Sequence, residues 1–297
     1  MLGLWSVSSV ALCAGEAPVA RTVPALEFAG AERKAAEAHV ALLSAPDAQA
    51  RERAERSLAL CGPAVRPLLE PLLKGADPNA AAAAARLLAL PALAANLPRV
   101  RIVLERGAVE AVLFEDDAPN TVANFVQLAE NRFYDGLDFH RVVEQFMIQG
   151  GDPTGTGRGG TGYRIADEID AVALGLDKLT AKELAEQTGH PAPKATSGLT
   201  LKALYEKQGF TYTAGLKSHP VARGALAMFG PRPNANSSQF FIAQVECPWL
   251  NGRHTVFGQV VRGLEFVDTI RKGEKMLKVE VLFKRDHGYA VKKLEEK

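Results

Sequence analysis

The chain has 297 residues, more than one compact domain usually contains, so we expect one medium-sized domain with an accessory segment. Its 35 basic and 34 acidic residues nearly cancel, which argues against a nucleic-acid surface or an anionic membrane as partner. The three cysteines lie far apart without metal-ligand spacing, so neither a disulfide framework nor a zinc site is indicated.

The first residues, MLGLWSVSSVALCAGEAP, form a short apolar run followed by small residues. This run has the length of a signal-peptide core and is too short to span a bilayer as a helix. It lacks the basic residues that usually precede such a core. We assign residues 1–28 as a candidate signal peptide and linker. Cleavage there would export the protein, as a periplasmic or membrane-associated form, and otherwise the protein is expected to be cytoplasmic.

Residues 29–98 are rich in alanine and leucine spaced three and four apart, the period of amphipathic helices. Prolines and glycines at 45–47, 61–63 and 75–79 divide this segment into three or four short helices. The stretch 62–90 resembles a HEAT-type helical repeat over one to two units. Because so few units rarely fold alone, a small helical bundle packed on the following domain is an equal alternative. Either form is a candidate site for a protein partner.

At Val100 the period changes from helical to alternating. The stretch 100–117 predicts two β-strands that turn at Arg106 and Gly107, and the stretch 118–136 predicts a helix that begins at Pro119. Many short strands with few helices are typical of a barrel or a sandwich. Further strands are predicted at 139–143, 146–151, 224–229, 238–245, 254–261 and 277–284.

A helical interruption is predicted between the strands at 146–151 and 224–229, at about 170–222. Its helices are expected at 179–189 and 199–210, and Thr180 with Glu183 fits a capping box at the start of the first. We interpret this stretch as an insertion from the edge of the β domain, either inert or a docking surface.

Three separated blocks carry a family resemblance: FHRVVEQFMIQGGDPTGTGRGG, SSQFFIAQ and WLNGRHTVFGQVVRG. In this order they resemble the cyclophilins, the peptidyl-prolyl cis/trans isomerases, and the similarity runs from about 100 to 285 apart from the insertion. The resemblance implies a mainly β fold: a closed eight-stranded antiparallel barrel with two capping helices and a substrate groove on its outer face. The expected organisation is an all-α segment at 29–98, an isomerase domain at 99–287 and a charged tail at 288–297.

The expected chemistry is rotation about the peptide bond that precedes a proline. Rotation is opposed by a barrier of about 18–20 kcal/mol because the nitrogen lone pair is delocalised. A donor aimed at that nitrogen stabilises the twisted transition state, in which the lone pair is localised. Arg141 is our candidate for this catalytic donor, held by Gln149, since alternation places both residues on one face if their strands are neighbours. An ordinary surface ion pair is the alternative for a lone strand arginine.

Holding the proline requires an apolar hollow, and the resemblance implies that Phe146, Met147, Phe241 and Leu250 line it with His254 at its rim. Plain core packing is the alternative for these apolar residues. The histidine is given no acid-base role, because the rotation transfers no proton. The resemblance also implies that Trp249 contacts ligands at the edge of the groove and that Gln239 anchors substrate backbone. Phe229 and Gly230 stand where cyclophilins usually have Ala-Asn, a segment that by resemblance binds substrate mainly through its main-chain groups. Gly230 is expected to keep this role, whereas the bulk of Phe229 changes the expected substrate preference more than the activity.

Two neighbouring features receive structural interpretations. His140 is expected to face away from Arg141 as a hydrogen-bonded structural histidine. The glycines at 150–160 are expected to make tight turns and not a phosphate loop, because no P-loop lysine follows and the run does not open a helix.

The sequence therefore predicts an isomerase that accelerates rotation about X-Pro bonds and assists protein folding, with proline-containing client segments as partners and no cofactor or metal. A non-catalytic proline-binding module or holdase chaperone is the alternative from another functional class. The resemblance further implies that a cyclic peptide inhibitor of the cyclosporin type binds the groove, with Phe229 weakening it.

Overall fold

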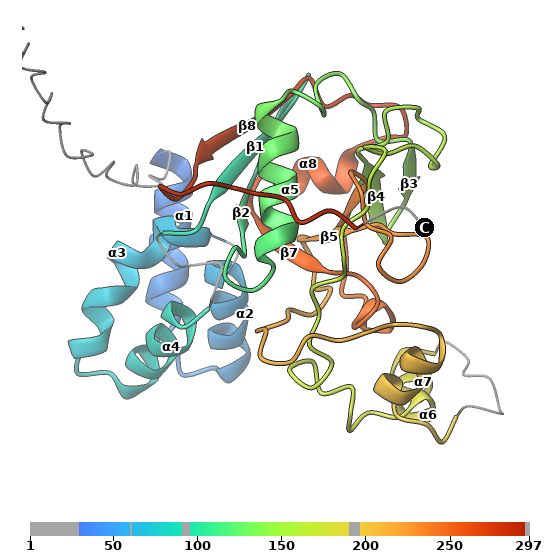
Figure 1. Cartoon of the computed structure of the whole chain (residues 1–297). Helices are drawn as coiled ribbons and strands as arrows, with labels where there is room; N and C mark the ends of the chain where they lie inside the picture. Colours follow the sequence, from blue (N-terminus) through green and yellow to red (C-terminus); the bar gives the residue numbers. More distant parts are fainter. Residues whose placement is uncertain (1–29, 60, 91–95, 190–196, 295–297) are drawn as a thin grey trace, which may run out of the picture.

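The computed structural model describes residues 30–59, 61–90, 96–189 and 197–294. The described chain has three regions: a group of N-terminal helices, a curled β-sheet with its helices, and an insertion with two short helices that interrupts the sheet region (Figure 1). The candidate signal peptide at 1–28 lies outside the described residues, so export stays a prediction. Among the helices of the described part, none combines the length and apolar character needed to cross a membrane.

The N-terminal region is helical, as its alanine and leucine spacing predicts. Its breaks fall at the expected prolines and glycines, and Asp77 caps the last helix by accepting hydrogen bonds from the backbone N–H groups of Asn79 and Ala80. The helical character is confirmed, whereas a HEAT-like identity stays a prediction. The elements are α1 (Gly30–Leu42), α2 (Ala48–Ala59), the 3₁₀ turn η1 (Gly62–Val65), α3 (Arg66–Leu69), the 3₁₀ turn η2 (Glu70–Lys74) and α4 (Pro78–Leu88).

The central region is one antiparallel sheet of eight strands in the order β3-β4-β6-β5-β7-β2-β1-β8. Each strand lies in a stretch predicted from the alternating pattern, and β1 and β2 form the expected hairpin. The strands are β1 (Arg99–Leu104), β2 (Gly107–Leu113), β3 (Arg141–Val143), β4 (Met147–Gly150), β5 (Ala225–Met228), β6 (Phe240–Ala243), β7 (Val256–Arg262) and β8 (Lys278–Phe283).

The sheet is strongly curled, but its edge strands β3 and β8 do not pair with each other. The segments that precede these strands meet instead: Asp138 and Lys275 form a bridge, and the Phe139 N–H donates to Glu274 O at 2.9 Å. The predicted eight antiparallel strands are confirmed, and the predicted closed barrel is corrected to a curled sheet joined by loop backbone. Strand β3 has only three residues, too few to continue a ladder across the gap. With its helices, the whole chain is mixed α and β and not mainly β.

Two helices cover the sheet, as the resemblance implied. Helix α5 (Pro119–Glu130) begins at the predicted proline, and its buried face packs on the concave side of the sheet. Helix α8 (Leu264–Thr269), which the alternating pattern did not locate, packs beside the β1–β2 turn. A Cβ on Gly107 would lie 2.3 Å from the Phe266 ring, so only glycine permits this approach. The core includes Ile102, Leu113, Phe125, Tyr134, Phe139, Ile148, Phe240 and Phe257.

The N-terminal helices pack against the sheet region through a second apolar cluster, which joins residues of α1, α2 and α4 to Val112, Ala225 and Val261. At the junction, Gly62 adopts a left-handed backbone with φ of 60°, and a Cβ there would lie 2.7 Å from the Val261 Cβ. The helical segment is therefore in direct contact with the β domain.

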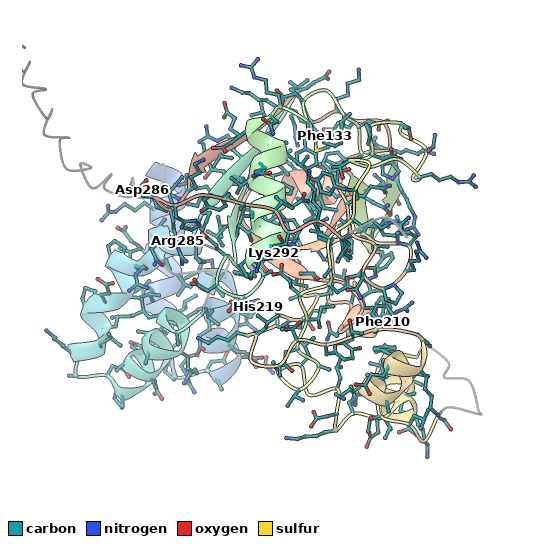
Figure 2. The ribbon with its side chains drawn as sticks, in the orientation of Figure 1. Phe133, Phe210, His219, Arg285, Asp286 and Lys292 are labelled. Carbon is teal, nitrogen blue, oxygen red and sulfur yellow. The ribbon has the colours of Figure 1, made fainter. Side chains whose placement is uncertain are left out.

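The insertion forms its own small core and carries α6 (Ala181–Thr188) and α7 (Leu201–Lys207). The predicted capping box is confirmed: the Glu183 N–H donates to Thr180 Oγ1 at 3.2 Å, and the Thr180 N–H donates to Glu183 Oε2 at 2.8 Å. Phe210 follows α7 and packs on Tyr205, with ring centroids 6.0 Å apart (Figure 2).

The described end of the predicted charged tail lies along α5 (Figure 1). The Lys292 N–H donates to Asn120 Oδ1 at 2.7 Å. Earlier in the same segment, Arg285 pairs with Asp116 (Arg285 and Lys292 are labelled in Figure 2). The last described residue, Leu294, forms a bridge with Arg164. The segment therefore ends beside the glycine-rich loop that follows β4.

Candidate active site

The four strands β3, β4, β6 and β5 separate two chemically different surfaces. Register pairs Arg141 with Gln149, Gln149 with Phe241, and Phe241 with Ala227, so these residues form one row across the outer face. The next row, Val142, Ile148, Ile242 and Leu226, belongs to the apolar core on the inner face. The expectation that alternation brings Arg141 and Gln149 onto one face is confirmed.

A chain of hydrogen bonds holds the arginine from behind. The Arg141 Nη1 donates to Gln149 Oε1 at 3.3 Å, and the Gln149 Nε2 donates to Gln239 Oε1 at 2.9 Å. Gln239 in turn donates through Nε2 to the backbone O of Gly159 at 2.9 Å. Both glutamines are buried, while Arg141 is exposed. Only one end of the guanidinium is fixed, which leaves its other N–H groups directed to solvent or to a ligand.

Beside this arginine lies a hollow of about 220 Å³. Eight of the predicted site residues line it together, with one further residue that the sequence analysis did not select, Arg253. Gln239, Gly230 and Trp249 do not line the hollow, although they were predicted to contact substrate. The lining residues are Arg141, Phe146, Met147, Gln149, Phe229, Phe241, Leu250, Arg253 and His254.

Phe146 reaches the hollow through the tight turn between β3 and β4. Gln145 adopts a left-handed backbone with φ of 56° in this turn, and the Phe146 N–H donates to Val143 O at 3.1 Å. Gln244, at the end of β6, holds the same residue from the other side, because its N–H donates to Phe146 O at 2.8 Å. Backbone bonds therefore fix the ring at the mouth of the hollow.

His254 stands in the wall of the hollow as a neutral imidazole. Its Nδ1 lies 3.0 Å from Met228 O, and because a carbonyl oxygen can only accept, Nδ1 carries the proton. Burial lowers the pKa of His254 to about 4, which the Met228 bond opposes and the charge of Arg253 assists. The ring packs edge-on against Phe241 at a centroid distance of 5.3 Å.

Phe229 occupies the opposite side of this histidine. The two rings are stacked at 6.4 Å with an angle of 13°, and the Phe229 N–H donates to Gln239 O at 2.9 Å. Within the described residues, no group bonds to the N–H or C=O of the next residue, Gly230, so its backbone stays available. A Cβ at this glycine would lie 2.9 Å from Asn236 Oδ1, which explains why no larger residue fits without a shift.

The remaining wall comes from the loop around η5 (Pro248–Leu250), and the insertion supports this loop. The Tyr205 ring of α7 lies 5.7 Å below the guanidinium carbon of Arg253, and the Tyr212 hydroxyl donates to Gly252 O at 3.1 Å. Trp249 packs between the two parts, with its ring 5.9 Å from Phe146. The sequence analysis did not select Arg253 as a site residue. The signal for it in the sequence is a basic side chain directly before His254.

Two structural expectations near the arginine have different outcomes. His140 is buried, as expected, but neither ring nitrogen has a hydrogen-bond partner among the described residues, so the expectation of a bonded histidine was wrong. The glycines make turns as expected: Gly155 and Gly157 have left-handed backbones. The Asp152 carboxylate holds this loop together by accepting the Thr154 N–H at 2.7 Å and the Gly157 N–H.

The arrangement combines a fixed cation, an apolar hollow and a neutral histidine. It can bind an apolar ring and donate a hydrogen bond to an atom at the rim of that ring. In the described part of the chain, no group of three or more His, Cys, Asp or Glu residues has a geometry that could hold a metal ion.

Sequence comparisons identify relatives of the β region. A family model described as cyclophilin type peptidyl-prolyl cis-trans isomerase/CLD matches residues 99–284. A "Peptidyl-prolyl cis-trans isomerase-like 1" of Rhizopus delemar is 37% identical over 174 residues, covering 57% of this chain and 78% of that protein. "Peptidyl-prolyl cis-trans isomerase B" of Bacillus subtilis is 37% identical over 180 residues, covering 60% of this chain and 94% of that protein.

A comparison of folds finds a cyclophilin type isomerase of Cryptosporidium parvum with a TM-score of 0.43 and 25% identity, covering 62% of this chain and 97% of that one. The family model does not extend over the N-terminal helices, which stay unidentified.

Proposed function

Because this chain belongs to the cyclophilin-type peptidyl-prolyl cis-trans isomerase family, we propose that it isomerises X-Pro bonds in client proteins through a hydrogen bond from Arg141 to the prolyl nitrogen. The proline ring enters the hollow of about 220 Å³ on the outer face of the sheet. Arg141 at the rim of this hollow is the single observation that carries the proposal.

The proposed role follows from where charge changes during rotation. In either planar ground state the nitrogen lone pair is delocalised into the carbonyl, and the nitrogen is a poor acceptor. In the twisted transition state the lone pair is localised, so a donor aimed at the nitrogen stabilises this state selectively. Arginine suits the task because its guanidinium stays protonated and has N–H groups beyond the one that bonds Gln149.

The surrounding residues have positioning and binding roles in this proposal. Gln149 fixes the rotation of the guanidinium, and Gln239 fixes Gln149. Gln239 therefore supports the catalytic donor through Gln149. Contact between Gln239 and the substrate backbone remains a prediction, for which the second lone pair of its Oε1 is the acceptor. His254 contributes an uncharged wall, since burial keeps its imidazole neutral at physiological pH. The free backbone of Gly230 is the proposed partner for the substrate main chain.

The experiment is a comparison of isomerisation rates for the intact protein and Arg141→Ala. We expect kcat/KM to fall about 100- to 1000-fold, the range typical for the loss of one transition-state donor. Arg141→Lys is the matched control, because it keeps the charge but loses the rigid fork, and we expect it to restore only part of the rate. Equal rates for the intact protein and Arg141→Ala would contradict the proposal.

A holdase that grips proline segments without useful turnover is the second candidate, and Phe229 favours it because its ring occupies part of the groove where the family usually has alanine. The two functions separate in one pair of measurements. A holdase would suppress aggregation of an unfolded client equally well with Arg141→Ala, whereas an isomerase would lose its acceleration of proline-limited refolding.

A further inference from the structure

A second hollow, of about 400 Å³, lies beside the first and has a different chemical character. Its wall combines the glycine-rich loop after β4 with the segment between β5 and β6. Phe229 lines both hollows, so its ring forms the partition between them. The second hollow is lined by Gly157, Arg158, Gly159, Gly160, Gly162, Tyr163, Arg164, Phe229, Pro231, Arg232, Ala235, Ser237 and Gln239.

Three arginines, Arg158, Arg164 and Arg232, line this hollow, and no acidic residue does. Within the part of the chain that the structure describes, no carboxylate lies within 4.0 Å of any of the three guanidiniums. Several arginines elsewhere are paired with carboxylates, as in Arg223 with Asp268 and Arg285 with Asp116. Cations gathered around a concave surface attract an anion more strongly than the same charges spread over a surface.

The basic character extends to the rim. Lys293 of the C-terminal segment lies 4.2 Å from the centroid of the Tyr163 ring, and Tyr163 lines the hollow. The wall itself is held by neutral contacts: the Tyr163 hydroxyl donates to Asn124 Oδ1 at 2.6 Å, and the Thr161 N–H donates to Ser237 Oγ at 2.9 Å. Among the described residues of this hollow, the three guanidiniums are therefore the charged groups that have no carboxylate partner and are available to a ligand.

The hydrogen-bond row behind Arg141 links the two hollows. In the proposed function the prolyl nitrogen faces Arg141, and the residue before the proline is attached to that nitrogen. The row continues from Arg141 through Gln149 to Gln239, and Gln239 lines the second hollow. We place the residues that precede the proline along this row, past Gln239 and Phe229 and into the basic hollow. The peptide pair that is substituted after the proline tests this direction.

We propose that the second hollow selects client segments that carry an aspartate or glutamate within three residues before the isomerised proline. The carboxylate side chain enters between Arg158, Arg164 and Arg232, where charge-assisted hydrogen bonds hold it. This inference rests on the proposed isomerase function and adds the substrate class. The partition formed by Phe229 separates the acidic side chain from the proline ring.

The chain itself also carries carboxylates that compete with those of a client. Glu295 and Glu296 follow Leu294, whose backbone bridges to Arg164 at the edge of the hollow. A variant that ends at Leu294 removes these carboxylates while keeping every described residue. Comparing it with the full chain distinguishes selection of a client from occupation by the chain itself.

The test uses the full chain and acetyl-capped peptides that contain one X-Pro bond, with alanine before the proline except where glutamate or glutamine takes that position. Exchange rates are measured by nuclear magnetic resonance. A succinyl cap is avoided because it would add a carboxylate. Each peptide with glutamate at the first, second or third position before the proline is compared with its glutamine counterpart. A further pair places the substitution after the proline. Peptide affinity is measured in parallel by titration, so the preference is read even without turnover.

For the best position before the proline, we expect about a 5-fold advantage of glutamate over glutamine in kcat/KM and in affinity, consistent with partly exposed ion pairs. The advantage should disappear in the combined variant Arg158→Gln, Arg164→Gln and Arg232→Gln, while turnover of the glutamine peptide is kept. Lys74→Gln, an exposed charge change on η2, should leave it intact. High salt should reduce the advantage because it screens exposed charges.

Each other outcome has a definite meaning. Equal kcat/KM and equal affinity for the glutamate and glutamine peptides substituted before the proline would overturn the inference. If both peptides are still isomerised, the isomerase proposal survives. If the full chain isomerises none of the peptides but still binds the glutamate peptides more tightly than the glutamine peptides, the isomerase proposal is overturned and the inferred preference stands. A preference that appears only in the variant ending at Leu294 assigns the hollow to the chain's own carboxylates and overturns selection of clients by the full chain.

Discussion

The two faces of the β3-β4-β6-β5 sheet come from the same short strands but have different roles. The inner face belongs to the core, and the outer face carries the candidate site. On the inner face, Val142, Ile148 and Ile242 are apolar and belong to the core. On the outer face, their immediate neighbours Arg141 and Gln149 are joined by a hydrogen bond at the rim of the hollow of about 220 Å³. The pleat alone separates stability from chemistry, because successive side chains point to opposite sides.

This difference teaches that a substitution and its neighbour on one strand report on different properties. A change on the inner face should alter the free energy of unfolding and leave the rate of the folded enzyme unchanged. A change on the outer face should mainly lower the rate, with a loss of stability only where it also leaves a buried polar group without its partner. Arg141 is exposed and makes one hydrogen bond, so its removal should cost about 1 kcal/mol of stability or less while it removes the proposed donor.

The largest expected effect on the inner face comes from Ile148→Ala. Ile148 is fully buried in β4, and truncation leaves a cavity in the core, so we expect the free energy of unfolding to fall by about 2 to 5 kcal/mol. Urea denaturation measures this loss. Isomerisation per folded molecule, measured well below the transition, should stay within about 3-fold of the intact protein, since the outer face keeps its residues.

Ile148→Val is the graded control, with an expected loss of about 0.5 to 1.5 kcal/mol. A large fall in isomerisation for either variant while the protein is still folded would show that the inner face also sets the geometry of the site.

A smaller effect is expected from Gln149→Leu, which sharpens the comparison on the outer face. The substitution removes the acceptor for Arg141 and the donor for Gln239 while it keeps the side chain's bulk. We expect kcat to fall about 10-fold with KM nearly unchanged, because orientation of the donor matters in the transition state. Stability should fall by about 1 to 3 kcal/mol, since the buried Gln239 oxygen loses its partner.

Steady-state kinetics separates the two roles that Gln149 could have. An increase in KM with unchanged kcat would assign this residue to ground-state binding and not to positioning of Arg141.

Local pattern was enough to find the strands and the outer row. Alternation predicted that Arg141 and Gln149 share a face, and the register confirms it with the two residues directly opposed. The spacing of Thr180 and Glu183 likewise predicted a capping box that the structure contains. These features depend on residues close together in the sequence or on neighbouring strands, where pleat and helix period fix the geometry.

Features made by distant segments could not be read in the same way. The support of Arg253 by Tyr205 joins residues from the insertion and from the loop before β7, and no local period links them. The basic hollow is another example, because Arg158 and Arg232 come from separate loops around Phe229. The open edge between β3 and β8 also depends on loop backbone that meets across the sheet. Only the folded chain brings such groups together.

The smallest expected effect is that of pH on the isomerisation rate. A strong pH dependence of the rate would show that the chemistry of the outer face is not independent of the buried histidine. Burial lowers the pKa of His254 to about 4, so between pH 8 and pH 5.5 the folded protein keeps this imidazole neutral. The proposed reaction transfers no proton, and Arg141 stays charged. We therefore expect kcat/KM to vary by less than about 2-fold over this range, measured by magnetic resonance exchange without a coupling protease.

Stability should change over the same range although activity does not. The folded pKa of His254 lies below its ordinary value of about 6.5, so the unfolded chain takes up the proton first and stability falls as pH drops from about 6.5 towards 4. Burial lowers the pKa of His140 too, and this adds to the loss. Urea midpoints of the intact protein and His254→Gln, compared at pH 8 and 5.5, isolate the contribution of His254. An activity transition near pH 6.5 that His254→Gln abolishes would mean that this imidazole titrates in the folded site and takes part in the reaction.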